Sequence, residues 1–175
     1  IVAKPRVIDQ SVDVVVVMDV SNTMNSTHEG LGVGAAGYNV KDARLTHAKS
    51  AVNTFLDLYA VDENISTDRR FGLVTFNSYA NTVVPLTTLN TAEKAAEIKT
   101  TVNNITAPTG NRERFTNIEG GLQLAQNLLS QSNAAFKYII FITDGFPTTY
   151  IESGRSSTTK ITGYDTYMTG SYNAS

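Results

Sequence analysis

Two short apolar segments dominate the pattern of hydrophobic and polar positions along the chain. Residues 12–18 read Val-Asp-Val-Val-Val-Val-Met, with no polar alternation after Asp13, and residues 138–143 read Tyr-Ile-Ile-Phe-Ile-Thr. Both segments are rich in β-branched or aromatic side chains and are too short for buried helices. Because a strand without alternation is buried on both faces, the two segments predict central strands of a mainly parallel sheet.

Two further strands are predicted over residues 71–76 and 80–84, joined by a turn at 77–79. A connection this short favours a hairpin, which we place toward one edge of the sheet.

Helices are predicted in the intervals between the strands. Apolar positions recur every three or four residues in three segments, 42–59, 90–105 and 118–129. Asn90-x-x-Glu93 and Thr116-x-x-Glu119 resemble capping boxes at the starts of the second and third of these helices. Strands alternating with helices in this way predict an α/β fold.

Three segments do not fit a minimal α/β unit. Residues 24–41 are Gly-rich and predict a loop insertion into a core that spans 11–147. Residues 148–175 are polar, and we interpret them as a loop, an inserted arm or a truncated remainder of the domain. Residues 1–10 are interpreted as the end of a preceding segment or a linker.

The predicted sheet is incomplete at its C-terminal edge. If no strand follows the one at 138–142, its apolar edge is exposed, which favours aggregation unless something covers it. We expect the cover to come from a separate chain, from residues beyond Ser175, or from folding of 151–175.

Composition narrows the possible functions. A chain of 175 residues is the size of one domain, and its longest apolar run, 14–18, is far shorter than the ~20 residues that span a membrane. The net charge of −2 gives no basic surface for nucleic acid or an anionic membrane. The absence of cysteine excludes disulfides and thiolate sites, and the abundance of Thr, Asn and Ser favours an exposed surface protein.

Hydroxyl and carboxylate side chains follow both buried strands, where parallel strands end at one edge of the sheet. A third polar segment begins a predicted helix, so the three segments are Asp19-Val20-Ser21-Asn22-Thr23, Phe115-Thr116-Asn117 and Thr143-Asp144-Gly145. Hard oxygen ligands without His or Cys suit Mg²⁺ or Mn²⁺ rather than Zn²⁺ or copper.

Together these segments resemble a known family. Asp-x-Ser-x-Thr after a Val-rich strand, Phe-Thr-Asn-Ile-x-Gly-Gly-Leu before a helix and Ile-Thr-Asp-Gly after another strand are similar to the three loops that form the metal-ion-dependent adhesion site of a von Willebrand factor type A domain. The resemblance covers about residues 11–147. It implies a three-layer, Rossmann-like sandwich with a mainly parallel central sheet.

The resemblance also implies a role for each residue. The expected metal ligands are Asp19 and Asp144, acting through water, and Ser21, Thr23 and Thr116, acting directly. Thr23 stands where the family usually has Ser, and Asn22 replaces a frequent Gly. The expected contacts to a partner protein are Asn22, Asn117 and Gly145.

The function that the resemblance implies is adhesion without catalysis. Neutral hydroxyl ligands leave the cation under-neutralised, so an acidic side chain of a partner, such as a host matrix protein or receptor, completes the coordination. A narrower similarity to tip adhesins of Gram-positive pili implies an extracellular site at the bacterial cell surface or cell wall, with other subunits of a surface assembly as further partners.

Other interpretations remain open. Asp19 and Ser21 taken alone are ordinary helix caps, and Asp144-Gly145 taken alone is a common turn. Asp19-x-Ser21-x-Thr23 also partly resembles the Asp-x-Asp-x-Thr motif of haloacid-dehalogenase-type phosphatases, although Ser21 replaces the second Asp, the general acid. A structural assembly domain with a degenerate metal site is a third alternative.

Overall fold

The computed structural model describes residues 11–60, 69–109, 113, 115–145 and 147–149. Its sheet has four strands in the order β3-β2-β1-β4. Strand β1 pairs in parallel with both β2 and β4, and β2 pairs antiparallel with β3 across the turn at Asn77 to Tyr79. The strands are β1 (Val12–Asp19), β2 (Arg69–Phe76), β3 (Ala80–Thr88) and β4 (Phe136–Ile142).

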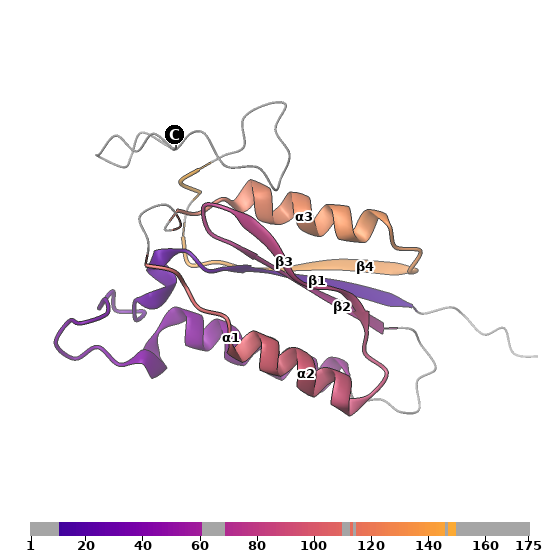
Figure 1. Cartoon of the computed structure of the whole chain (residues 1–175), viewed down its shortest axis with the longest axis horizontal. Coiled ribbons are helices and arrows are strands. Elements are labelled where there is room, and N and C mark those ends of the chain that lie inside the picture. Colours follow the sequence, from indigo (N-terminus) through magenta and orange to yellow (C-terminus); the bar gives the residue numbers. More distant parts are fainter. Residues whose placement is uncertain (1–10, 61–68, 110–112, 114, 146, 150–175) are drawn as a thin grey trace, which may run out of the picture.

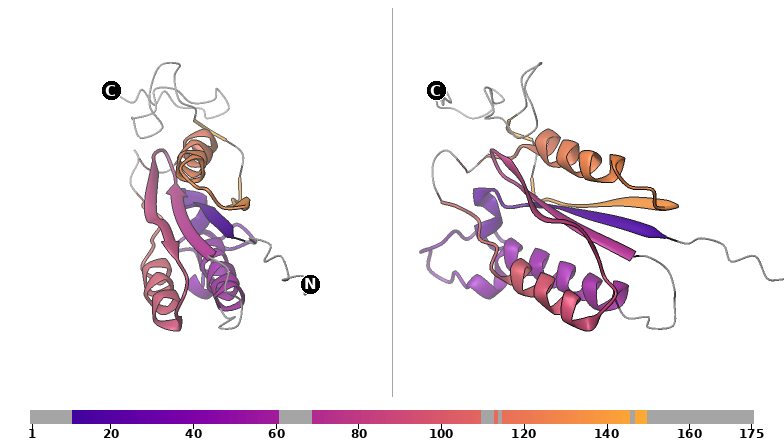
Figure 2. Two further views of the ribbon diagram at one scale, coloured as in Figure 1. Left: turned by 90° about the vertical axis from the view of Figure 1, so that its right-hand side faces the viewer. Right: turned by 45° about the vertical axis from the view of Figure 1, so that its right-hand side comes forward.

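Helices cover both faces of the sheet. Helix α3 lies on one face and α1 and α2 lie together on the other, as Figure 1 and the end-on view in Figure 2 show. The predicted three-layer sandwich is therefore confirmed. The α-helices are α1 (Arg44–Tyr59), α2 (Ala92–Asn103) and α3 (Ile118–Ser130), and two short 3₁₀ helices are η1 (Asn22–Asn25) and η2 (Val40–Asp42).

Strand β1 is buried because it separates two hydrophobic clusters. Val16 and Met18 pack in the cluster formed with α1 and α2, whereas Val15 and Val17 pack in the cluster formed with α3. Side chains of β1 that point alternately to the two faces of the sheet are therefore all buried, with exposures of 4% or less from Val14 to Met18. This explains the run without polar alternation.

Strand β4 lies at the edge of the described sheet, so the prediction that it is central like β1 was wrong. Large apolar side chains of β4 remain exposed: Phe136 by 48%, Tyr138 by 53%, Ile139 by 40% and Phe141 by 38%. The predicted apolar edge is present in the described residues. What covers it stays a prediction, because residues 1–10 and 150–175 lie outside the described part of the chain.

Helices α1 and α2 begin two residues later than predicted, whereas α3 begins at Ile118 as predicted and differs only in its cap. Thr91, and not Asn90, caps α2 by accepting a hydrogen bond from the Lys94 N–H, and Asn117, and not Thr116, caps α3. Helix α1 begins at Arg44 rather than Asp42 because 40–42 form a separate 3₁₀ turn. The cap at Asn117 leaves the hydroxyl of Thr116 without a capping role.

The 24–41 segment leaves η1 and returns through η2 as a loop. Its base is closed by a β-bridge between Thr27 and Ala43. Three glycines in the loop have positive φ, a backbone conformation that other residues rarely adopt: Gly30, Gly34 and Gly37. Among the helices that the structure describes, none combines the length and apolar character needed to cross a bilayer.

The variant Gly121→Ala should destabilise the fold. A Cβ at this position of α3 would lie 2.9 Å from Cδ1 of Phe76 and 3.0 Å from Cγ1 of Val17. We expect a loss of about 1–3 kcal/mol in the free energy of unfolding, measured by urea denaturation, because overpacking outweighs the better helix propensity of alanine.

Gly32→Ala is the matched control, since a Cβ there meets no atom within 4 Å. It should change the free energy of unfolding by less than about 0.5 kcal/mol. Equal stability of the two variants would show that the packing of α3 on β1 and β2 is not as tight as described.

Candidate metal site

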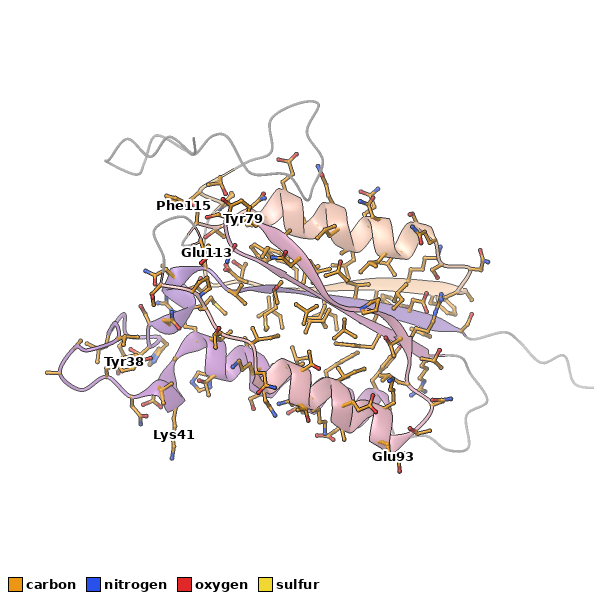
Figure 3. The ribbon with its side chains drawn as sticks, in the orientation of Figure 1. Tyr38, Lys41, Tyr79, Glu93, Glu113 and Phe115 are labelled. Atoms are coloured by element: carbon orange, nitrogen blue, oxygen red, sulfur yellow. The ribbon has the colours of Figure 1, made fainter. Side chains whose placement is uncertain are left out.

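The three polar segments meet at one edge of the sheet. Strands β1 and β4 run in parallel and in register, so the residues after Asp19 and after Ile142 emerge side by side. The end of β2 joins the third segment to them: the Val20 N–H donates to the Phe76 carbonyl at 2.7 Å, and the Asn117 N–H donates to the Asn77 carbonyl at 2.8 Å. In Figure 3, Phe115, Tyr79 and Glu113 mark this end of the molecule.

The Asp19 carboxylate is fully buried and held on both oxygens. Oδ1 accepts a hydrogen bond from the Ser21 N–H at 2.7 Å, and Oδ2 accepts one from the Thr143 hydroxyl at 2.7 Å. Burial raises the pKa of Asp19, the nearby charge of Asp144 adds to the rise, and these hydrogen bonds offset part of it. No cationic side chain of the described chain forms an ion pair with this carboxylate.

A line of oxygen atoms runs from Ser21 to Asp144. Ser21 Oγ lies 3.2 Å from Thr23 Oγ1, and Thr23 Oγ1 donates to Asp144 Oδ1 at 3.0 Å. Because Thr143, which holds Asp19, immediately precedes Asp144, the same two loops bring together four of the five predicted metal ligands.

Thr116 reaches the same edge by its backbone. Its N–H donates to Thr148 Oγ1 at 2.8 Å, and its carbonyl accepts from the Thr148 N–H at 3.0 Å. Thr148 lies on the segment that follows Asp144. Within the described chain no hydrogen bond joins the Thr116 hydroxyl to the other four predicted ligands, so only the backbone of Thr116 is tied to this edge.

The predicted partner contacts differ in exposure. Asn22 and Gly145 are exposed, whereas Asn117 is buried with 0% exposure. Asn117 Oδ1 accepts from the Gly120 N–H at 2.9 Å, and a Cβ on Gly120 would lie 2.4 Å from Asn117 Nδ2. The structure thus gives Asn117 the role of capping α3. Because Gly120 has no side chain, it leaves room for that cap.

Several polar residues that support the site were missed by the sequence analysis. Asn77 and Ser78 were assigned only to a turn, yet both are buried, and Ser78 Oγ accepts from the Phe115 N–H at 3.1 Å. Thr143 lies inside a quoted motif but had no assigned role. Arg44 Nη1 lies 2.6 Å from Asp144 Oδ2. Nothing in the sequence indicated this contact, because Arg44 has the position of an ordinary helix residue.

The donors fit a hard divalent cation. Two carboxylates and neutral hydroxyls gather here, and the described residues contain no group of three His, Asp or Glu side chains that would form a different type of site. Oxygen donors of this kind suit Mg²⁺ or Mn²⁺. The buried carboxylate of Asp19, which forms no ion pair within the described residues, is the feature that a bound cation would compensate most directly.

The sequence also matches a family profile. Residues 14–146 match the profile of the von Willebrand factor type A domain, and this range includes all three polar segments. Domains of this family often hold a divalent cation at their adhesion site. No curated protein sequence matches the chain significantly.

Several of the solved structures with a similar fold are proteins of bacterial pili. PilB, a minor pilin of Streptococcus sanguinis, has 22% identity and a TM-score of 0.66 over 86% of this chain. The type V pili tip protein Mfa5 of Porphyromonas gingivalis has 23% identity and a TM-score of 0.61 over 81% of this chain. The pilus adhesin RrgA of Streptococcus pneumoniae has 22% identity and a TM-score of 0.59 over 81% of this chain.

These similarities establish the fold. The chain spans only part of each solved protein, namely 34% of the PilB chain and 21% of each of the Mfa5 and RrgA chains.

The variant Asp19→Asn should leave the metal-free protein at least as stable as the wild type near neutral pH. Because the pKa of Asp19 is raised, the folded state binds more protons than the unfolded state, and the free energy of unfolding falls as pH rises from the ordinary value of 3.8 through the raised pKa. Asparagine carries no charge over this range, yet it can accept from the Ser21 N–H and donate to the Thr143 oxygen.

Urea denaturation in EDTA at about pH 4 and about pH 7.5 measures the effect. The free energy of unfolding of Asp19→Asn minus that of the wild type should increase as the pH rises. A variant that loses more than about 2 kcal/mol at the higher pH would instead show that the ionised carboxylate stabilises the metal-free fold through its hydrogen bonds.

Proposed function

Because the chain belongs to the von Willebrand factor type A domain family, we propose that it is an adhesion module that binds a partner protein through a divalent cation. The proposed metal ligands are Asp19, Ser21, Thr23, Thr116 and Asp144. The observation that carries the proposal is the continuous oxygen line from Ser21 through Thr23 to Asp144 beside the buried carboxylate of Asp19.

The proposed metal ligands and Thr143 have different roles. Asp19 fixes the first loop through the Ser21 N–H, and Thr143 fixes the orientation of Asp19. Ser21, Thr23 and Thr116 supply neutral hydroxyl oxygens, while Asp19 and Asp144 supply negative charge. When bound, Mg²⁺ or Mn²⁺ supplies a Lewis-acidic position that accepts a carboxylate oxygen of the partner.

The proposed partner presents an exposed Asp or Glu. Among the described residues, two carboxylates would face a bound divalent cation, and Arg44 pairs with one of them. Charge is therefore left for an incoming anion to neutralise, which supports recognition of an acidic side chain. Asn22 and Gly145 are exposed beside the oxygen line and are proposed to contact the partner next to that side chain, whereas buried Asn117 supports the loop from below.

The proposed place of action is the bacterial cell surface. A pilus tip protein, a pilus adhesin and a minor pilin with this fold support an extracellular role in adhesion or in a surface assembly. A host matrix protein or receptor is the proposed ligand, and pilus subunits are proposed as further partners. A Gram-positive cell wall stays a prediction, because the similar structures come from Porphyromonas as well as Streptococcus.

Phosphoryl transfer is less well supported. In such an enzyme Asp19 would act as a nucleophile, yet it is fully buried, and each of its oxygens already accepts a hydrogen bond. Ser21 stands where a second carboxyl group would act as the general acid. An assembly role with a degenerate metal site is distinguished from adhesion by the metal titration described next.

Mg²⁺ or Mn²⁺ is predicted to bind the EDTA-stripped, dialysed protein with one-to-one stoichiometry in isothermal titration calorimetry. Asp19→Ala and Thr116→Ala should each weaken binding by about tenfold or more, because each removes charge or an oxygen donor from the site. Circular dichroism melts should show that the variants remain folded.

Matched controls remove the same chemical groups elsewhere. Asp57→Ala deletes an exposed carboxylate of α1, and Thr88→Ala deletes an exposed hydroxyl at the far end of β3. Both should bind the cation like the wild type. A folded wild-type chain that binds no cation, in a displacement assay as well as by calorimetry, would refute the proposed function.

A further inference from the structure

A cationic side chain of the chain itself already contacts the proposed metal site. Arg44 is the first residue of α1, and its Nη1 lies 2.6 Å from Asp144 Oδ2. The Asp144 side chain is 9% exposed and that of Arg44 is 30% exposed, so solvent screens this pair less than a surface ion pair. The guanidinium contacts the carboxylate whose other oxygen accepts from Thr23.

The backbone fixes the position of Arg44. Its N–H donates to the Ser26 carbonyl at 3.0 Å, and the preceding residue, Ala43, forms the β-bridge with Thr27. Ser26 lies only three residues after Thr23, so the returning end of the 24–41 loop is attached to the same loop that carries the proposed ligands. The backbone contacts therefore place Arg44 beside the site, within reach of Asp144.

The formal charges of the hydrogen-bonded group give Arg44 a defined role. Asp19 and Asp144 contribute two negative charges, Arg44 contributes one positive charge, and the hydroxyls are neutral, so the group carries a net charge of −1. A bound divalent cation changes this to +1. Without Arg44 the loaded group would be neutral and would have less attraction for an anionic ligand.

We propose that Arg44 is a specificity-determining counter-ion: it neutralises Asp144 in the metal-free protein, weakens cation binding, and leaves the loaded site positive so that it selects an acidic ligand. This inference rests on the proposed metal-dependent function. It assigns the preference for a carboxylate to a residue of this chain in addition to the cation.

A merely orienting role for Arg44 makes the opposite prediction. If the guanidinium only held Asp144 in place, its removal would weaken cation binding, as loss of a group that orients a ligand does. If its charge dominates, removal strengthens cation binding, because repulsion between the guanidinium and the cation is relieved. The sign of the change in affinity separates the two roles.

The test compares Arg44→Gln with the wild type in two titrations. The first measures the Kd of Mn²⁺ alone by calorimetry, and the second measures the Kd of acetate for the Mn²⁺-loaded protein from the loss of water-proton relaxation as acetate displaces metal-bound water. We expect Mn²⁺ to bind at least about fivefold more tightly to Arg44→Gln and acetate to bind at least about threefold more weakly. The metal-free variant should also melt at a lower temperature, since Asp144 loses its partner.

Three further variants keep the test decisive. Arg44→Lys retains the charge and should stay within about twofold of the wild type in both titrations. Arg44→Met also removes the charge while keeping an aliphatic stem, so it should reproduce both affinity changes if the glutamine variant folds poorly. Arg69→Gln removes a guanidinium that donates to the Tyr59 carbonyl, away from the site, and should change neither Kd.

The outcomes distinguish failure of this inference from failure of the proposed function. A wild-type protein that binds no Mn²⁺ overturns the proposed function and this inference with it. A wild-type protein that binds Mn²⁺, with Arg44→Gln and Arg44→Met binding it equally or more weakly, overturns only the counter-ion role. Tighter Mn²⁺ binding with unchanged acetate affinity overturns the assignment of ligand selectivity to Arg44.

Discussion

Burial of the Asp19 carboxylate is the constraint on which the account of this site depends. The residue ends the most deeply buried strand, is fully excluded from solvent, and forms no ion pair with a cationic side chain of the described chain. Burying an ionised carboxylate without a counter-charge is costly, and the raised pKa of Asp19 expresses that cost. A bound cation would supply the missing counter-charge. A buried carboxylate at a strand end is what a binding site calls for, since its groups are positioned for a ligand rather than for stability.

The fold brings further oxygen donors to that carboxylate by aligning strand ends. Because β1 is paired in parallel with β4, Asp19 and Asp144 emerge side by side, and Thr143 links them by its hydrogen bond to Asp19. The polar end of β2 positions the third loop, since Asn77 and Ser78 contact the backbone of Asn117 and Phe115. The oxygen donors therefore come from loops, while rigid strands and the start of α3 set their positions, which is the usual arrangement of binding sites at the carboxyl edge of a parallel sheet.

Local pattern predicted much of this arrangement, and tertiary contacts account for the rest. The unalternated run of β1 was sufficient to predict a strand between two helical layers, and motif order placed Ser21, Thr116 and Asp144 at one edge. The pattern of β4 predicted an apolar edge but not what covers it, because an apolar strand has the same sequence pattern whether or not a neighbour pairs with it. The cap of α3 was misassigned to Thr116 because Thr and Asn both cap well. Arg44 was missed because its partner is 100 residues distant in sequence.

The central claim is that the hydroxyls of Ser21, Thr23 and Thr116 share one cation. Crystals of the protein soaked in Mn²⁺ and measured near the manganese absorption edge test it directly, since the anomalous signal locates the ion independently of any assumed ligand. The account predicts one strong peak in contact with these three hydroxyls, with Asp19 and Asp144 nearby through water. A peak elsewhere, or no peak in crystals of the folded protein at saturating Mn²⁺, would contradict it.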